Sequence, residues 1–467
     1  MTIPPHRLLG LVCAAVCFLP CPARADAPDA PLWKAGAARV KITPDKPMWM
    51  AGYASRTRPA DETLIDLYAK ALALEDPDGK RFVLVTMDLV GVPRDLSQAV
   101  CADLKDKYGL PRESVVLAAS HTHTGPIVGS NLRDMFDLDE MQQKRIDNYA
   151  AALHKNLVAV VGKALDDLAP ARLAWGNGHV GFAVNRRNNK EADVPKLREV
   201  GELKGPVDHD VPVLSVRDPQ GKLRAVVFGY ACHATVLNSM AWSGDYPGFA
   251  QLAVEKMHPD ATAFFWAGCG GDQNPLPRRS VFLAQKYGQE LADGVQAVLD
   301  EPMTPIEGNL RSVYTEIDLP LADLPSRDQL VKDTIDMNHA VAARAKRLLA
   351  GLEKKGSLAG SYPYPVQVCR LGPDLTWVML GGEAVVDYSL RLKKELGPGH
   401  TWVAAYTNDV MAYIPSLRVL KEGGYEGGGA MVYYGLPAVW SPLVEETIVA
   451  AVHAQVEKVR DGAAKDR

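Results

Sequence analysis

Residues 114–119 read SVVLAA, and residues 120–126 follow directly with SHTHTGP. The apolar, β-branched run predicts a buried strand, and the Gly-Pro pair predicts that the strand ends and a loop opens. Two histidines at i and i+2 on an extended chain point to opposite faces. We therefore expect one of the two, His121 or His123, to bind a metal ion while the other faces a substrate.

The rest of the chain alternates short apolar runs with amphipathic helical patterns. Strands are predicted at residues 64–75, 81–88, 114–120, 223–232, 261–267, 375–381 and 401–407. Helices are predicted at residues 97–108, 141–168, 247–257, 281–299, 326–353 and 385–396. This alternation predicts an α/β fold of mixed β-sheets covered by helices. With no linker or repeat to divide it, the chain from 26 to 467 is expected to be one domain. The long charged helix near residues 326–355 is interpreted as an insertion whose charged face is exposed to solvent.

The first 25 residues have the features of a signal peptide. Residues 8–19 are an apolar run too short to span a bilayer, and Ala23-Arg24-Ala25 has the form of a signal peptidase site. We expect cleavage after Ala25 and a secreted or periplasmic protein. No later segment is long and apolar enough to predict a membrane span.

Charge and cysteine content exclude several classes of protein. The formal net charge of −4 becomes −6 once Arg7 and Arg24 are removed with the signal peptide. No basic block compensates, so a nucleic-acid partner or an anionic membrane is not expected. Four cysteines remain in the mature chain: Cys101, Cys232, Cys269 and Cys369. Four cysteines allow three disulfide pairings, and the sequence does not choose among them. Buried, unpaired thiols are at least as good an interpretation as a disulfide.

Other polar or glycine-rich segments also follow predicted strands. They are residues 230–235 (YACHAT), 267–275 (AGCGGDQNP), 381–383 (GGE) and 406–409 (YTND). The ends of strands are the usual place for function in α/β sheets, although a histidine such as His233 is also found there as a hydrogen-bonded core residue. No Lys-Ser/Thr follows the glycines, so a Walker-type phosphate loop is not indicated. Residues 423–429 (GGYEGGG) predict a loop.

The order of these motifs resembles that of the neutral ceramidases, secreted zinc amidases that cleave N-acyl-sphingosine. Residues 120–126 are similar to the family's THTHSGP, residues 184–186 (VNR) to its NxNR segment, and residues 232–235 (CHAT) to its THGT. Residues 382–383 match its GE, residues 408–413 its N-x-Y-x-x-Y, and residues 425–426 its YE. Each piece is short, but their order is shared from about residue 35 to about residue 434.

The resemblance implies roles for individual residues. The zinc (Zn²⁺) ligands it implies are His121, His233, Glu383 and Tyr413. The substrate-contacting residues it implies are His123, Arg186 and Tyr425. Two imidazoles and a carboxylate are a common catalytic zinc set that leaves room for water. The neighbouring Arg187 leaves open which arginine faces the substrate.

Three departures from the family pattern bear on the reaction. Asn274 stands where the family carries a serine often described as catalytic, and an amide is not a nucleophile. Asp409 replaces the first of two spaced tyrosines, and the chain ends at Arg467 without the family's C-terminal β-sandwich. We expect zinc-activated water as the nucleophile, with Asn274 donating a hydrogen bond to a substrate oxygen. The alternative for Asn274 is a structural turn residue.

The sequence therefore predicts an exported zinc-dependent hydrolase that cleaves an amide in a small-molecule or lipid-like N-acyl compound. One alternative is a metal-dependent enzyme acting on an ester or a uronate-containing saccharide, with His123 and Tyr425 moving protons. Another is a non-catalytic binding protein with a degenerate metal site. A degenerate site should have lost a ligand, and all four candidate positions hold a plausible one.

Overall fold

The computed structural model describes residues 33–465, so the expected signal peptide lies outside the described residues. The described residues belong to one compact unit. Within the described part, no helix combines the length and the apolar character that crossing a bilayer requires.

A mixed sheet of nine strands forms one layer of this unit. In spatial order it contains β11 (Thr262–Ala267), β9 (Leu223–Tyr230), β8 (Asp210–Arg217), β6 (Ala169–His179), β1 (Trp33–Lys41), β3 (Tyr68–Glu75), β4 (Arg81–Met87) and β5 (Val115–Ala119), with β13 (Thr304–Pro305) paired to β6. The outer pairs β4–β5 and β9–β11 are parallel, and the inner pairs are antiparallel.

A second sheet of four strands packs against the first. Its strands are β14 (Leu310–Pro320), β15 (Ser361–Leu371), β16 (Leu375–Leu380) and β18 (Thr401–Ala404). One apolar cluster contains buried side chains of both sheets, among them Phe264, Trp266 and Trp377. The rings of Trp266 and Trp377 lie 5.4 Å apart, so aromatic side chains fill much of the space between the layers.

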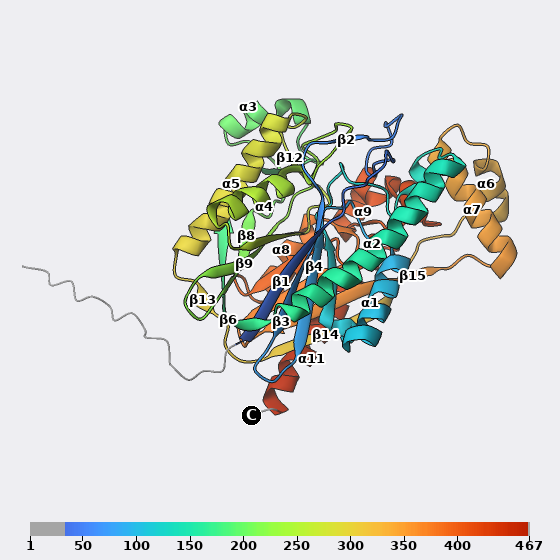
Figure 1. Cartoon of the computed structure of the whole chain (residues 1–467). Coiled ribbons are helices and arrows are strands. Elements are labelled where there is room, and N and C mark those ends of the chain that lie inside the picture. Colours follow the sequence, from blue (N-terminus) through green and yellow to red (C-terminus); the bar gives the residue numbers. More distant parts are fainter. Residues whose placement is uncertain (1–32, 466–467) are drawn as a thin grey trace, which may run out of the picture. The chain divides into compact units, whose positions relative to one another are not determined.

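Helices cover the outer faces of the two sheets (Figure 1). The α-helices are α1 (Arg94–Tyr108), α2 (Glu140–Asp166), α3 (Val194–Glu199), α4 (Asp245–Met257), α5 (Val281–Asp300), α6 (Arg327–Asp333), α7 (His339–Lys355), α8 (Val386–Leu396), α9 (Leu417–Glu422), α10 (Met431–Tyr434) and α11 (Val444–Lys465). Helix α2 packs on β1 and β3, α5 on β6 and β8, and α11 on β14 and β15. The predicted α/β fold with helix-covered mixed sheets is confirmed.

Short elements complete the structure. They are the strands β2 (Glu62–Thr63), β7 (Ala183–Asn185), β10 (Ala241–Trp242), β12 (Gln273–Pro275), β17 (Glu383–Ala384) and β19 (Tyr413–Ile414), and the 3₁₀ turns η1 (Arg112–Ser114), η2 (Arg133–Met135) and η3 (Glu191–Asp193). The glycine-rich segment predicted to be a loop contains a π-helical turn, η4 (Tyr425–Gly429), in which Gly428 leaves helical geometry at φ 155°.

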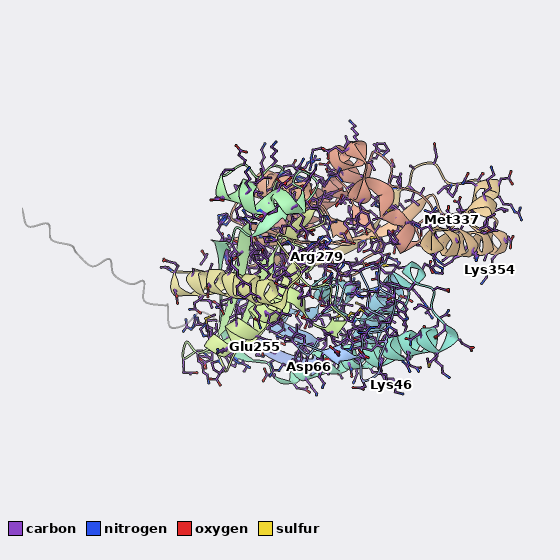
Figure 2. The ribbon with its side chains drawn as sticks, turned by 90° about the horizontal axis from the view of Figure 1, so that it is seen from above. Lys46, Asp66, Glu255, Arg279, Met337 and Lys354 are labelled. Atoms are coloured by element: carbon purple, nitrogen blue, oxygen red, sulfur yellow. The ribbon has the colours of Figure 1, made fainter. Side chains whose placement is uncertain are left out.

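The prediction of one helix over residues 326–353 is wrong, because the structure has two helices, α6 and α7, separated by residues 334–338. The Asn338 side chain accepts from the backbone N–H of Ala340, and the Asp336 carboxylate accepts from the N–H of Asn338. Such short polar side chains compete for backbone groups and so start a new helix instead of continuing the old one. Figure 2 labels two exposed residues of this region: Met337, between the two helices, and Lys354, near the end of α7.

The ends of three strands from both sheets meet at one place. Ala118 at the end of β5 bridges Thr407, and Gly268 after β11 bridges Ala404 at the end of β18. The amide N–H of Ala405 also donates to the carbonyl of Ala267. The polar motifs that follow these strands are therefore brought together, although they lie far apart in the sequence.

Candidate metal centre

The two histidines of the SHTHTGP segment lie beyond the strand that precedes them. Strand β5 ends at Ala119, and His121 has a φ of 60°, in the left-handed region. Strand alternation therefore does not apply to this pair. The Nε2 atoms of His121 and His123 are 3.1 Å apart, so the expectation that the two imidazoles face apart is wrong.

A third imidazole and a carboxylate join this pair. The His121, His123 and His233 side chains each offer a ligand atom, and these atoms all lie within 4.8 Å of one another. Glu383, on β17, places its Oε2 atom 2.9 Å from Nε2 of His121 and 3.1 Å from Nε2 of His233. Three segments that follow different strands thus supply one buried group of potential ligands.

The hydrogen bonds of two imidazoles fix which ring nitrogen faces the cluster. Nδ1 of His121 lies 2.6 Å from the carbonyl oxygen of Val90, and Nδ1 of His233 lies 2.6 Å from that of Gly270. A carbonyl oxygen only accepts, so each Nδ1 carries the proton in these contacts. In the neutral tautomer, Nε2 of both rings then presents a lone pair to the cluster, as in histidines that bind metal ions.

The charge states agree with this arrangement. Burial, reinforced by the charge of Arg186, lowers the pKa of His233 to about 4, so the ring is neutral at pH 7. Burial and the neighbouring imidazoles also hold the pKa of His123 well below its usual value. Burial alone would raise the pKa of the Glu383 carboxyl, but the adjacent imidazoles more than reverse this and keep it ionised. Lone pairs and a negative charge therefore converge on one small region.

The donor set fits a zinc ion. Glu383 Oε2 is buried and accepts no hydrogen bond from any described residue, which leaves this oxygen available to a metal ion. Ligand atoms about 2.0–2.2 Å from a tetrahedral zinc ion are separated by roughly 3.3–3.6 Å, so the 2.9 and 3.1 Å spacings of the Nε2 and Oε2 atoms need only a small outward shift. His121, His233 and Glu383 would hold the ion. His123 differs from the other two rings, because its buried Nδ1 has no partner among the described residues.

Tyr413 lies at the edge of the donor cluster. Its strand β19 pairs with β17 so that Tyr413 is directly opposite Glu383. The Tyr413 hydroxyl is 3.0 Å from Nε2 of His233 and accepts a hydrogen bond of 3.0 Å from Arg186. Burial and the Glu383 charge raise the pKa of Tyr413 well above its usual value. The hydroxyl therefore has the position of a fourth ligand and is protonated in the absence of a metal ion.

Arg186 connects the donor cluster to Asn274. Its guanidinium donates to Glu426, Tyr413, the Gly271 carbonyl and Oδ1 of Asn274. Asn274 also accepts from Thr235, which orients its amide nitrogen. Both Arg186 and Asn274 line a pocket of about 540 Å³. The adjacent Arg187 lines it too, and its guanidinium pairs with Glu422 and Glu426.

Tyr425 begins the η4 turn beside this pocket. Its ring lies 5.3 Å from that of Tyr413 and is 45 % exposed. Gly423 and Gly424 precede it with φ values of 69° and 78°, a backbone conformation that favours glycine. The structure thus brings every predicted site residue to the cluster or to the wall of the adjoining pocket.

Sequence reasoning missed the groups that support these side chains. Arg56 donates to the backbone carbonyl of His123, and Gly52, at φ 95°, lies so close that a Cβ would be 2.4 Å from Nδ1 of His123. The Tyr434 hydroxyl donates a short hydrogen bond to Oε1 of Glu383. Gly52 and Arg56 fall in residues 35–57 (AGAARVKITPDKPMWMAGYASRT), a segment that resembles the family's opening segment with its DIT…GY core, which is a usable signal. Tyr434 carries no comparable sequence signal.

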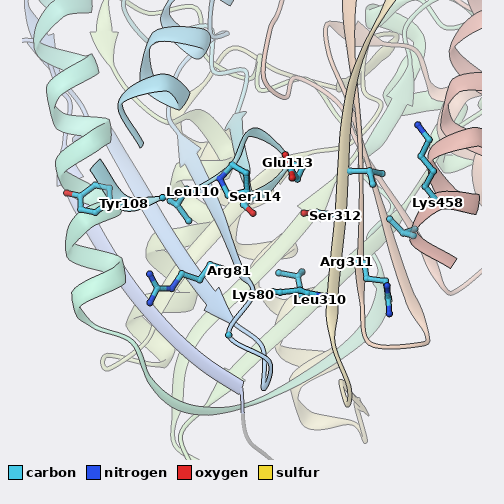
Figure 3. Close-up of a pocket in the computed structure, with 15 residues that line it drawn as sticks. Lys80, Arg81, Tyr108, Leu110, Glu113, Ser114, Leu310, Arg311, Ser312 and Lys458 are labelled. Carbon is cyan, nitrogen blue, oxygen red and sulfur yellow. The ribbon is translucent and has the colours of Figure 1, made fainter. Parts of the chain in front are cut away.

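Other chemically distinctive groups lie away from the cluster. The four described cysteines are free and buried, so the interpretation as buried thiols is confirmed. A pocket of about 570 Å³ contains Arg81 and Ser114 at the beginnings of β4 and β5, together with Leu310 and Lys458 (Figure 3). The histidines follow the other end of β5, so this pocket belongs to a different part of the molecule.

Comparison with known proteins agrees with the fold and the motifs. A family described as "Neutral/alkaline non-lysosomal ceramidase, N-terminal" matches residues 33–334, and the chain belongs to this family. The neutral ceramidase of Pseudomonas aeruginosa is 30 % identical over 253 residues, which cover 52 % of this chain and 36 % of that one. Neutral ceramidase A of Dictyostelium discoideum is 24 % identical over 228 residues, covering 47 % and 29 % of the two chains. The matches thus span about a third of these relatives.

A solved structure shows the same fold. The crystal structure of neutral ceramidase from Pseudomonas aeruginosa aligns with a TM-score of 0.69 over 92 % of this chain and 74 % of that chain, at 21 % identity. At this level of identity the match shows the fold alone.

Proposed function

We propose that this protein is a zinc-dependent amidase that hydrolyses an N-acyl compound. The observation that carries the proposal is the convergence of Nε2 of His121 and His233 on Oε2 of Glu383, with both Nδ1 atoms held by backbone carbonyls. Membership of the ceramidase family supports amide cleavage.

In the reaction, water supplies the new C–O bond, the C–N bond breaks, and the amine leaves with a proton. When bound, zinc supplies Lewis acidity, which lowers the pKa of water to about 7 and polarises a carbonyl. His123 is neutral at pH 7 and its Nε2 faces the donor cluster, so this nitrogen can accept the proton and deliver it to the leaving amine.

The remaining side chains bind and orient the substrate. The Asn274 amide nitrogen makes no hydrogen bond within the described residues, and the role assigned to it is to donate to the developing oxyanion. Arg186 positions both Asn274 and Tyr413 through its hydrogen bonds. Tyr425, at the start of the η4 turn, lines the pocket and is half-exposed, so its role is to contact the substrate.

A panel of N-acyl compounds incubated with the zinc-loaded protein tests this proposal. We expect release of a free amine and a carboxylate, and loss of both after chelation, with recovery when zinc is returned. Zinc binding without turnover of any amide would instead support a binding protein.

We also propose that the protein is exported, because residues 1–25 carry an apolar run and an A-x-A site. N-terminal sequencing of the protein recovered from a periplasmic or secreted fraction should begin at Asp26. Recovery of the full-length chain from the cytoplasm would contradict this proposal.

A further inference from the structure

The pocket beside Arg186 is close to the donor cluster. It has a volume of about 540 Å³ and includes Arg186, Asn274 and Tyr425 in its wall. Arg186 donates to the Tyr413 hydroxyl, which is 3.0 Å from Nε2 of His233. The Arg186 and Tyr413 side chains therefore lie between the pocket and the imidazoles, so the pocket is adjacent to the donor cluster.

The wall of this pocket is strongly polar. Three arginines and three glutamates line it: Arg186, Arg187, Arg278, Glu191, Glu422 and Glu426. Leu276 is the aliphatic side chain in the wall, and it is almost completely covered by its neighbours. The charges balance, so the pocket favours neither an anion nor a cation.

Such a wall gives a hydrocarbon chain little reason to bind. Burying a methylene group in apolar surroundings contributes about 0.8 kcal/mol, but a charged wall supplies no such surroundings. A hydrocarbon chain would also take water from the Arg278 and Glu191 side chains without replacing its hydrogen bonds. Lengthening the chain of a substrate should therefore add little to its affinity here.

Several groups in the wall have hydrogen-bonding capacity that the described residues do not use. Arg278 donates through Nε and Nη2 to Oε2 of Glu191, which leaves Nη1 of Arg278 and Oε1 of Glu191 available. The Asn274 amide nitrogen is a further donor, and the half-exposed ring of Tyr425 offers an aromatic face. Adjacent donors and acceptors are complementary to hydroxyl groups, which both donate and accept.

We propose that the substrate portion held in this pocket is rich in hydroxyl groups, as in an N-acylated amino sugar, and is not a hydrocarbon chain. This inference rests on the proposed amide hydrolysis and names the substrate class for the same site. Sugar hydroxyls would bond to Arg278, Glu191 and Asn274, and the C–H face of the ring would lie on Tyr425.

Binding of two N-acetyl amides to the zinc-loaded protein tests the inference without depending on turnover. N-acetylglucosamine carries hydroxyls, whereas N-acetyl-octylamine carries a hydrocarbon chain. Calorimetry should show that N-acetylglucosamine binds at least about tenfold more tightly, and release of amine is followed in parallel. The Arg278→Leu variant should weaken sugar binding by about tenfold through loss of one charged hydrogen-bond donor.

Arg279→Leu is the matched control, because Arg279 also donates to Oε2 of Glu191 but does not line the pocket. Its affinity for N-acetylglucosamine should equal that of the unaltered protein. Equal or tighter binding of N-acetyl-octylamine would overturn the inference, as would the absence of saturable sugar binding or equal effects of the two variants. Binding of the sugar without amine release would leave the inference standing and count against the proposed hydrolysis.

Discussion

The buried donor cluster and the charged pocket beside it differ in how their side chains are held. Backbone carbonyls of Val90 and Gly270 fix two imidazoles of the cluster, and strand pairing fixes Glu383 opposite Tyr413. In the pocket, charged side chains hold one another, as in the pairs that Arg187 makes with two glutamates. The comparison indicates that the cluster determines the chemistry, while the pocket can be altered to change the substrate.

The largest effect is expected from replacing a cluster histidine. Loss of a residue that hydrogen-bonds to a metal ligand weakens metal binding by ~10–100-fold. His233→Ala removes a ligand itself, so it should weaken zinc binding by more than this and abolish turnover. Zinc content after dialysis, measured by elemental analysis, checks the result. In the parallel variant His123→Ala, the metal should stay near its normal content while turnover falls sharply. Loss of metal from both variants would show that His123 is a ligand and that the assigned roles are wrong.

Asn274 lies between the donor cluster and the pocket, and its replacement should have the next largest effect on turnover. Asn274→Ala should lower kcat by roughly 10²–10³-fold at most, the cost of one oxyanion donor, with zinc content unchanged. Steady-state kinetics on a cleaved N-acyl substrate measure this. An acyl group trapped on any serine of the protein would contradict the role given to water.

Tyr434 tests whether a group outside the cluster supports the carboxylate. Tyr434→Phe removes the donor to Oε1 of Glu383 and should weaken zinc affinity by about 10–100-fold. Competition with a zinc-binding dye measures the affinity directly. Tyr433→Phe, which alters the adjacent ring on α10, should leave it unchanged. Equal affinities of the two variants would mean that Tyr434 does not orient Glu383.

Asp409 should have the smallest effect on the site and a clear effect on stability. Burial raises the pKa of its carboxyl from 3.8 to about 7, while Tyr362 donates to it. The folded protein therefore retains a proton between these two values that the unfolded chain has lost. The free energy of unfolding falls as the pH rises through this window, by a few kcal/mol at about 1.4 kcal/mol per pKa unit.

Asp409→Asn removes this titration and should stabilise the protein at pH 8 much more than at pH 4. Urea unfolding at the two pH values measures the difference. The exposed residue Asp318 provides a control, since Asp318→Asn should change stability little at either pH. A stabilisation of equal size at both pH values would show that the Asp409 carboxyl is not the cause.

Much of the fold follows from local patterns, and the limits have physical reasons. Strands such as β4 and β5 are short apolar runs bounded by turn residues, so their ends were predicted to within one residue. Strands β1 and β14 have mixed burial along their length, and therefore lack the regular pattern that identifies a strand. The break between α6 and α7 depends on side-chain hydrogen bonds that helical periodicity does not reveal.

The candidate site was predicted as a set of residues but not as a geometry. His121, His233 and Glu383 carry a signal because they are polar residues after apolar strands. The positive φ of His121 turns its ring toward His123, and no sequence pattern predicts that angle. Backbone carbonyls such as that of Gly270, and a partner such as Tyr434, are also missing from any motif, because tertiary structure alone brings them into contact.

The zinc content of the purified protein tests the central claim most directly. After dialysis against metal-free buffer, elemental analysis should find about one zinc ion per chain, as expected for one site of three or four protein ligands. His121→Ala, His233→Ala and Glu383→Ala should each lose it. A chain that retains no metal and takes up none when zinc is added, or variants that bind zinc as well as the unaltered protein, would contradict the account.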